Sequence, residues 1–321
     1  MKRFTLLSIV LLASVPMGAR ASFDLILQYD EPTLGNGEID RYDPVSRAYL
    51  GSFRIAGGLS AASSMVASSA TGELYIRSQS TGNTIDVYNY STGAYLRQLR
   101  VATGKLALSR DGLSIRIIEG NSLYSVNPKT AVQTLVVTLA QSIPIGSAYV
   151  MSPSGRMIVA DDSTTRFRSY NTNGTLASSL LYSGGVTTVD QLALRTPPVG
   201  IGNVNNDFLG KTNLTNSVSG VEESSLGALS AESRSLSAYS SITGVLEAHA
   251  GMYFIGTQTA SPTVLKCAPM TAGAVIGPTF DLSQTTLLTG PSTIVLAPEP
   301  GTMVALAAGV GVLARRRRSK R

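Results

Sequence analysis

The chain has 321 residues, of which 43% are hydrophobic and 14% charged, with one cysteine, one histidine and no tryptophan. Its formal net charge of +6 comes from the two ends: without residues 1–21 and 298–321, it holds 17 Lys and Arg against 19 Asp and Glu. This balance excludes the basic face that nucleic-acid binding requires. The single Cys267 excludes a disulfide within the chain. We expect it to be a small, half-buried strand residue, and pairing between chains or a role as a nucleophile are the alternatives.

The N-terminus has the order of a secretory signal peptide. Two basic residues follow Met1, residues 4–15 form a short apolar core, and Ala19 and Ala21 are small residues at the two positions that signal peptidase reads. We therefore expect a signal helix over residues 1–21, cleavage after Ala21 and export. A buried N-terminal helix is the alternative.

Hairpins of similar sequence recur from residue 39 onwards. Each has a strand, a turn rich in Asn, Asp, Ser, Pro or Gly, and a second strand, because these turn residues supply fixed or positive φ angles. The hairpins begin at Ile39, Ile85, Leu123, Phe167 and Met252. Shorter hairpins precede three of them, with turns at residues 70–72, 109–112 and 152–155. Two hairpins in one unit make a four-stranded meander.

The repeat period predicts the fold. Tyr42, Tyr88, Val126 and Tyr170 are 46, 38 and 44 residues apart, and periods near ~40–45 residues with four short strands are typical of β-propellers. We expect an all-β propeller over residues 22–297, with about six four-stranded blades and seven as the alternative count. Residues 23–27 would close the ring by completing the blade formed by the last segments of the domain, which include residues 292–296. A pair of β-sandwiches and a β-solenoid are the other folds that this pattern allows.

The repeats resemble those of bacterial propellers of the NHL and lactonase-like group. The resemblance rests on the Ser-x-x-Gly hairpins and on Tyr-Asx-x-x-Thr-Gly hairpins such as the one at residues 88–93. It implies the propeller fold and carries no active-site motif.

Residues 183–250 are the least regular part. Glycine and asparagine at positions 200–207 suggest a loop, and residues 213–237 are rich in Ser and Asn. We expect one degenerate blade with an insertion here, and disorder is the alternative.

Few residues could carry chemistry. His249 could act as a general base or a ligand, but it has no companion histidine, and we favour a structural role or a surface ion pair with Glu247. The paired acids Asp161-Asp162 and Asp30-Glu31 could hold calcium, the only cofactor suggested, whereas solvated turns are the plainer interpretation. No metal site is expected from spacing, and no nucleophile motif is present.

The C-terminal 24 residues form a distinct segment. Pro298, Glu299 and Pro300 precede an apolar run of 13 residues, 302–314, which as a helix would be about 20 Å long and so marginal as a transmembrane helix. The basic cluster that follows is expected on the cytoplasmic side, with the body of the protein outside. It consists of Arg315, Arg316, Arg317 and Arg318.

This arrangement resembles the PEP-CTERM sorting signal of Gram-negative bacteria. Gly301 stands where Ser or Thr is frequent in that family. The resemblance implies processing by exosortase, a membrane enzyme with a cysteine nucleophile, and an association with exopolysaccharide and biofilm. An ordinary C-terminal anchor is the alternative.

Three functions fit these features. The first is an exported, non-catalytic propeller, sorted to the cell surface or extracellular matrix, that binds a partner such as extracellular polysaccharide. The second is an exported lactonase, lyase or glycan-acting hydrolase with a site in the central channel, and the third is an oligomerising scaffold. Several tyrosines could stack on sugars or pack between blades: Tyr29, Tyr42, Tyr49, Tyr88, Tyr90, Tyr95 and Tyr124.

Overall fold

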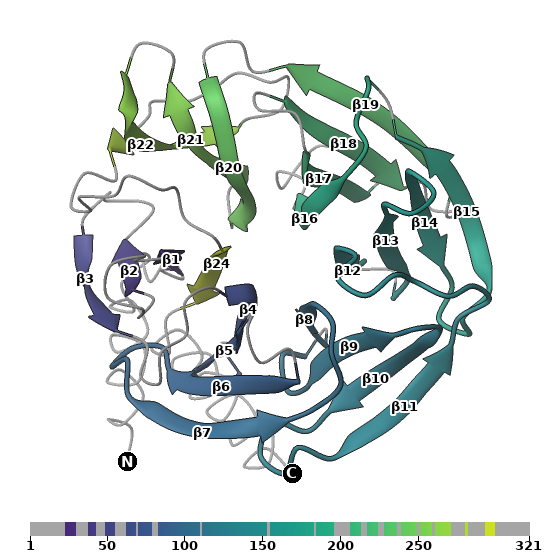
Figure 1. Cartoon of the computed structure of the whole chain (residues 1–321), viewed down its shortest axis with the longest axis horizontal. Coiled ribbons are helices and arrows are strands. Elements are labelled where there is room, and N and C mark those ends of the chain that lie inside the picture. The colour runs from purple at the N-terminus through teal and green to yellow at the C-terminus, as the bar shows by residue number, and fades with distance from the viewer. Residues whose placement is uncertain are drawn as a thin grey trace, which may run out of the picture.

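The computed structural model describes the greater part of the chain between Phe23 and Pro298. The described residues are 23–29, 38–42, 49–54, 62–68, 70–78, 83–109, 111–152, 155–182, 184–195, 206–212, 217–223, 228–235, 239–248, 251–258, 261–270, 280–281 and 293–298. Their regular structure consists entirely of β-strands (Figure 1). No helix among these residues is long and apolar enough to cross a membrane. The helices expected at residues 1–21 and 302–314 lie outside the described residues.

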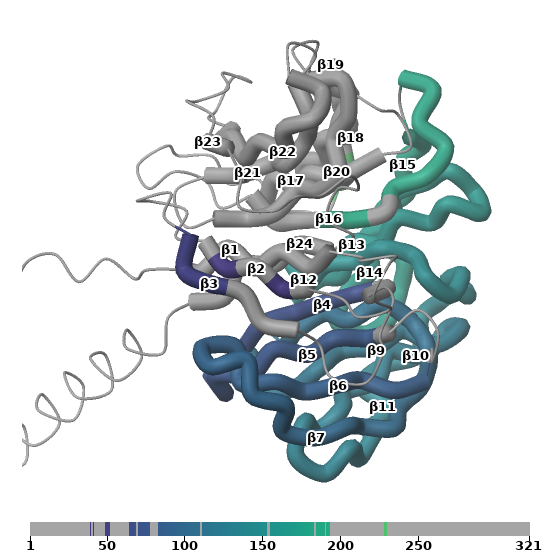
Figure 2. The backbone as a smooth tube through the Cα atoms, turned by 60° about the vertical axis from the view of Figure 1, so that its left-hand side comes forward, coloured from purple at the N-terminus to yellow at the C-terminus, as the bar shows by residue number. Residues whose placement is uncertain are grey.

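The strands of the described residues form six four-stranded antiparallel sheets. Three of these sheets lie between Ala62 and Leu181: β4 (Ala62–Ser68), β5 (Glu73–Ser78), β6 (Thr84–Asn89) and β7 (Tyr95–Arg100); β8 (Leu106–Leu108), β9 (Ile115–Glu119), β10 (Ser122–Val126) and β11 (Gln133–Thr138); and β12 (Tyr149–Met151), β13 (Met157–Asp161), β14 (Arg166–Tyr170) and β15 (Leu176–Leu181). Figure 2 shows strands β4 to β7 from the side, lying one below another across their sheet.

Two further sheets follow in chain order, and one sheet joins the two ends. They are β16 (Val189–Arg195), β17 (Asn206–Thr212), β18 (Ser217–Glu223) and β19 (Leu229–Ser235); β20 (Tyr239–Ala248), β21 (Gly251–Gln258), β22 (Ser261–Met270) and β23 (Phe280–Asp281); and β24 (Thr293–Pro298), β1 (Phe23–Tyr29), β2 (Glu38–Tyr42) and β3 (Tyr49–Arg54). The predicted all-β architecture of four-stranded meanders is confirmed.

The first strands of neighbouring sheets contact one another in a closed series. β24 contacts β4, and the series continues through β8, β12, β16 and β20 back to β24. Figure 1 shows the sheets arranged around a common centre in this order. Radial stacking buries both faces of each sheet, which a single four-stranded sheet could not do alone.

Hydrophobic clusters fill the spaces between neighbouring sheets. Tyr75, Ile85 and Val87 of the β4–β7 sheet pack with Ile115 and Ile117 of the next sheet, and each of these side chains is at most 1% exposed. Equivalent clusters join β8–β11 to β12–β15 and β12–β15 to the start of β16. The β-branched residues at these positions suit a pleated surface that is buried on both faces.

The ring closes by pairing the first strand with the last. β1 lies between β24 and β2, and its register with β24 runs from Phe23 opposite Pro298 to Gln28 opposite Thr293. The predicted closure by residues 23–27 and 292–296 is confirmed.

The stretch from residue 183 to 250 is more regular than predicted. The prediction of a loop at positions 200–207 is wrong for Asn206 and Asp207, which begin β17. The Ser- and Asn-rich residues 213–237, for which disorder was the alternative, contain the strands β18 and β19. The reason is that β17 and β18 are central strands, which backbone hydrogen bonds to strands on both sides stabilise whatever their side-chain hydrophobicity. β19 is the edge strand and pairs with β18 alone. The later hairpin predicted from Met252 onwards is confirmed as β21 and β22.

Candidate functional site

The predicted sorting motif, Pro298 to Pro300, begins inside the sheet that closes the ring. Pro298 is the last residue of β24, and the chain enters β1 at Phe23 on the opposite side of the same ladder. Glu299, Pro300, Arg315, Arg316, Arg317 and Arg318 lie outside the described residues, as do Ala19 and Ala21 at the expected signal cleavage site. The structure thus brings the strand that precedes the predicted sorting segment beside the strand that follows the expected signal segment.

In the sheets β4–β7, β8–β11 and β12–β15, a tight turn joins the first and second strands. Gly72, Gly112 and Gly155 have φ angles of 68°, 69° and 83° in these turns, a region that glycine adopts without steric strain. In each turn, the backbone N–H of the glycine donates a hydrogen bond to the carbonyl of a preceding serine, for example Gly112 to Ser109 at 2.8 Å. Pro298 and Phe23 occupy the corresponding place in the closing sheet, where the chain is not continuous.

The acid pair Asp161-Asp162 has a structural role. Asp161 is 1% exposed; its carboxylate accepts hydrogen bonds from the Ser163 hydroxyl at 2.6 Å and from the Thr164 hydroxyl at 2.9 Å. It also forms an ion pair with Arg168 at 2.8 Å. These contacts fix the turn between β13 and β14, and they occupy the oxygens that a calcium ion would need.

Asp162 connects its turn to the next sheet. Its Oδ1 accepts hydrogen bonds from the Tyr182 hydroxyl at 2.8 Å and from the backbone N–H of Val189, the first residue of β16, at 3.0 Å. Burial, and then the hydrogen bond to Asp162, raise the pKa of Tyr182. No cluster of three His, Cys, Asp or Glu side chains that could hold a metal occurs among the described residues.

The remaining candidates are placed only in part. Glu247 lies in β20 opposite Met252, while His249, Asp30 and Glu31 lie outside the described residues. Cys267 lies in β22 opposite Ile255, as expected for a strand residue.

The tyrosines divide between core and surface. Tyr88 and Tyr90 are buried, Tyr124 is half-buried, and Tyr49 and Tyr95 are exposed at 39% and 48%. The Tyr95 ring meets Tyr88 edge-on at 5.5 Å between centroids, which leaves one side of it open to solvent. The side chains of Tyr29 and Tyr42 lie outside the described part of the structure.

A polar cluster at the start of β5 and β7 was not predicted. Arg97 forms two hydrogen bonds to Glu73, at 2.9 and 2.8 Å, and its Nε donates to the carbonyl of Pro128 in the next sheet at 2.9 Å. The Tyr75 hydroxyl donates to the same carboxylate at 2.8 Å, and burial raises the pKa of this tyrosine. The partners are 24 and 31 residues apart, so no local spacing could reveal them.

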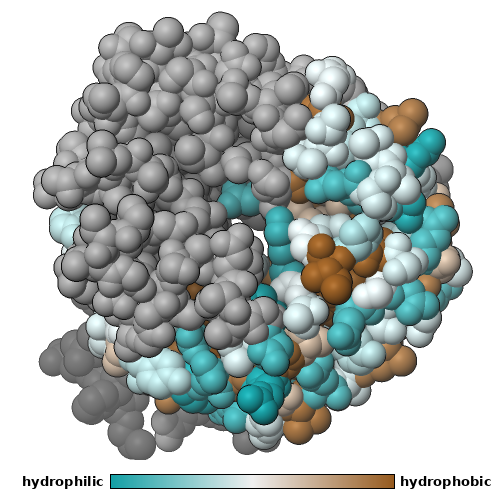
Figure 3. Space-filling view, viewed as in Figure 1, coloured by the Kyte–Doolittle hydropathy of each residue, from teal (hydrophilic) through white to brown (hydrophobic). Residues whose placement is uncertain are grey.

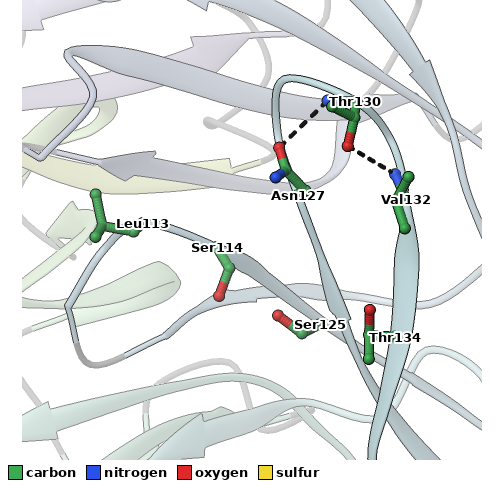
Figure 4. Close-up of a pocket in the computed structure, with 7 residues that line it drawn as sticks. All are labelled: Leu113, Ser114, Ser125, Asn127, Thr130, Val132 and Thr134. Carbon is green, nitrogen blue, oxygen red and sulfur yellow. Dashed lines mark hydrogen bonds between the residues drawn. The ribbon is translucent and has the colours of Figure 1, made fainter.

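A shallow hollow of about 410 Å³ lies on the β8–β11 sheet (Figure 4). Hydroxyl and amide groups dominate its lining, and the apolar Leu113 and Val132 are 56% and 59% exposed. None of the lining side chains is charged, so the hollow suits a neutral ligand that both donates and accepts hydrogen bonds, such as a sugar. The residues are Leu113, Ser114, Ser125, Asn127, Thr130, Val132 and Thr134.

The Asn127 side chain shapes this hollow. Its Oδ1 accepts hydrogen bonds from the backbone N–H groups of Lys129 at 2.8 Å and Thr130 at 3.2 Å, which holds the turn between β10 and β11 (Figure 4 draws the second). The sequence signals near the hollow are two predicted turns, at residues 109–112 and in the hairpin that begins at Leu123. The lining hydroxyl groups themselves gave no signal, because serine and threonine are common throughout the chain. On the face seen in Figure 3, polar and apolar residues are mixed over the described part of the surface.

Comparisons with known proteins agree with the predicted sorting motif and with the propeller fold. The PEP-CTERM protein-sorting motif matches residues 291–318, which include β24. No curated protein matches the chain in sequence. The motif is typical of exported proteins that an exosortase-type membrane enzyme recognises and that are sorted in the Gram-negative cell envelope.

Solved structures of propeller type are similar in fold. A protein of unknown function from Bacteroides caccae has a TM-score of 0.58 and 12% identity, covering 87% of this chain and all of that one. A streptogramin B lyase has a TM-score of 0.52 and 10% identity, covering 85% and 91% of the two chains. Virginiamycin B lyase from Staphylococcus aureus, in an inactive form with quinupristin, has a TM-score of 0.50 and 13% identity, covering 84% and 78%. At these identities the likeness establishes the fold and carries no activity to this chain.

Proposed function

We propose, from the premise that this chain carries a PEP-CTERM sorting motif, that it is an exported six-bladed β-propeller sorted by its C-terminus to the cell surface or extracellular matrix. The observation that carries the proposal is the continuity of β24 with the motif, because the ring-closing strand leads directly into the sorting segment. Six four-stranded sheets and the closed series of contacts between their first strands support the blade count.

The sorting role is tested by two chains, one complete and one ending at Pro298. Since β24 ends at Pro298, the shorter chain keeps every paired residue of the closing strand and loses only Glu299 to Arg321. We expect the complete chain in the membrane fraction or at the surface, and the shorter chain in the periplasm or medium. Equal membrane retention of both chains would contradict the sorting role.

For the domain itself, we propose binding of a neutral extracellular polysaccharide. The uncharged, hydroxyl-lined hollow between the β8–β9 turn and the β10–β11 hairpin supports this proposal, since such groups match the hydroxyls of a sugar. The exposed Tyr49 and Tyr95 offer ring faces at the rim of other sheets.

A glycan array probed with the chain that ends at Pro298 tests the binding role. The informative variants are Thr134→Val, inside the hollow, and Thr138→Val, which makes the same change on the same strand outside it. We expect Thr134→Val to weaken binding several-fold, because one buried hydrogen bond to a ligand contributes about 1 kcal/mol, and Thr138→Val to leave it unchanged. Binding that survives Thr134→Val unchanged would remove the hollow from the proposal.

A further inference from the structure

One face of the propeller is built from the turns that join first and second strands, and we call it the turn face. The turn after β4 contacts the turn after β8 directly, because the Ser68 hydroxyl donates to the carbonyl of Gly112 at 2.6 Å. In the closing sheet, the place of this turn is taken by Phe23 and Pro298. The sorting segment therefore leaves the propeller from the turn face.

The connection from the ring to the apolar run is very short. Only Glu299, Pro300 and Gly301 separate Pro298 from the apolar run that starts at Thr302. Four residue steps span at most about 14 Å even when fully extended. The headgroup layer on one side of a bilayer is itself roughly 6 Å thick. With the apolar run in the hydrocarbon, little distance remains between the membrane surface and Pro298.

The opposite chain end leaves from the same place. Residues 1–21, the expected signal segment, precede Phe23, which is the partner of Pro298. The basic residues of both segments are expected on the cytoplasmic side. Before processing, both segments would thus reach the membrane from one point on the turn face.

The side chains of the turn face suit such a contact. Leu113, at the tip of the turn after β8, is 56% exposed, and Val132 on the adjacent hairpin turn is 59% exposed. Lys129, on the same hairpin turn, is also exposed. Asp111, in the same turn as Leu113, is exposed too, so its charge offsets that of Lys129. The apolar side chains therefore carry the argument, because exposed apolar groups insert at the headgroup boundary.

We infer that the turn face lies on the membrane surface while the sorting segment is attached, with Leu113 at the headgroups. The hollow that Leu113 and Val132 also line would then face the membrane in the precursor and open to a sugar only after the segment is removed. The inference rests on the proposed sorting function. It gives the precursor one orientation, in which the ring axis stands upright on the membrane and the opposite face points away from it.

Ile145 provides a matched reference position on the opposite face. It is 68% exposed and lies in the loop that leads to the start of β12. The neighbouring Ile143 donates its N–H to the carbonyl of Gly120, in the turn between β9 and β10, at 2.8 Å. That turn is at the end of the sheet away from Leu113, about 20 Å from the turn face for a strand of average length.

The experiment uses the chain with its sorting segment, exported in a host without exosortase, with Cys267→Ala removing the only native thiol. Leu113→Cys and Ile145→Cys each receive a fluorescent label, and the proteins are bound to vesicles of phosphatidylethanolamine and phosphatidylglycerol that carry a nitroxide on the headgroup. We expect most of the fluorescence at position 113 to be quenched and that at position 145 to remain. Equal quenching at both positions, or none at either in vesicle-bound protein, would overturn the inference.

A variant with a 20-residue Gly-Ser linker inserted after Pro298 isolates the role of the short connection. Such a linker has an end-to-end distance of roughly 25 Å, so it should keep vesicle binding and lose most of the quenching at position 113. Undiminished quenching would show that the tether does not set the orientation, which contradicts the inference. If the unmodified chain does not sediment with vesicles at all, the proposed sorting function fails instead, so the two failures are distinguishable.

Discussion

Phe23 and Pro298 are partners across the antiparallel pair of β1 and β24, so the start and the end of the described chain share one sheet. This pairing closes a ring that otherwise has two open edges, at β1 and at the sheet of β20–β23. The same pairing places the sorting segment at the closure itself. Integrity of the fold and presentation of the sorting segment therefore depend on the same six-residue strand.

Removing β24 should destabilise the whole propeller, whereas removing the residues after it should not. A chain ending at Pro298 keeps all six pairs of the β1–β24 ladder, and a chain ending at Ser292 loses all of them. At about 1 kcal/mol for each hydrogen bond lost, we expect the second chain to lose roughly 5 kcal/mol or more of unfolding free energy. Urea unfolding followed by circular dichroism measures this. Equal midpoints for the two chains would contradict closure by β24.

A buried tyrosine hydroxyl links the β12–β15 sheet to the β8–β11 sheet. The buried Tyr149 of β12 donates to the carbonyl of Arg116 at 2.5 Å and lies 3.3 Å from that of Lys105. Tyr149→Phe should reduce the unfolding free energy by about 1–3 kcal/mol, because it leaves a buried carbonyl without its donor. The exposed Tyr95 is the matched control, and Tyr95→Phe should leave the thermal midpoint unchanged. A similar loss in both variants would show that the effect does not come from the buried hydrogen bond.

The parts of this fold that were predicted from sequence are those that repeat locally. Each hairpin carries its own turn residues, so the strands flanking Gly72, Gly112 and Gly155 follow from neighbouring positions alone. Closure by residues 23–27 was also predicted, because a ring of meanders needs a partner for its last strand.

The contacts between sheets could not be predicted in this way. Arg97 meets the carbonyl of Pro128, and Ser68 meets that of Gly112, across 31 and 44 residues. A backbone carbonyl is present at every position, so nothing in the sequence marks which carbonyl will accept a hydrogen bond from a side chain of another sheet. The hollow of the β8–β11 sheet is hidden for the same reason, since its hydroxyl groups converge only after the two turns fold against each other.

The outer hairpin turns contain one residue that is poorly suited to its conformation. Ala131 has a φ of 58°, whereas the corresponding Gly93 and Gly174 have φ angles of 72° and 83°. Ala131→Gly should stabilise the protein by about 0.5 kcal/mol, as relief of left-handed strain slightly exceeds the added entropy of the unfolded chain.

Gly174→Ala is the converse change and should be severe. A Cβ at this position would overlap the carbonyl oxygen of Thr138 in the preceding sheet. Backbone strain alone costs about 1–3 kcal/mol, so we expect a loss of roughly 3 kcal/mol or more with this contact added. Thermal unfolding of the two variants beside the parent chain measures both effects, and changes of the same sign would refute the assignment.

Asp86 should make the protein less stable at neutral pH than it would be with a neutral side chain. The residue is 6% exposed in β6, and burial raises the pKa of its carboxyl above the ordinary value of 3.8, although the hydrogen bond from Gln98 at 2.9 Å partly opposes the shift. The folded state then binds the proton more tightly than the unfolded state, so the contribution of Asp86 to stability falls as the pH rises through this raised pKa. Asp86→Asn removes the buried charge while keeping a hydrogen-bonding partner for Gln98. We expect the variant to be the more stable protein at pH 7, with the difference disappearing as the pH approaches 3.8.

Asp111 is the control for Asp86, because its pKa is shifted in the opposite direction. Its hydrogen bonds from the Ser109 hydroxyl, at 2.5 Å, and from the N–H of Leu113, at 3.0 Å, lower the pKa of its carboxyl. A lowered pKa means that the ionised form is favoured in the folded state, so its stabilisation is present above the ordinary value and is lost as the pH falls. Asp111→Asn should therefore reduce stability at pH 7 and converge with the parent chain in acid. Urea unfolding of the three proteins between pH 3 and pH 8 separates the two cases, and parallel curves for Asp86→Asn and the parent would show that Asp86 is not held at a raised pKa.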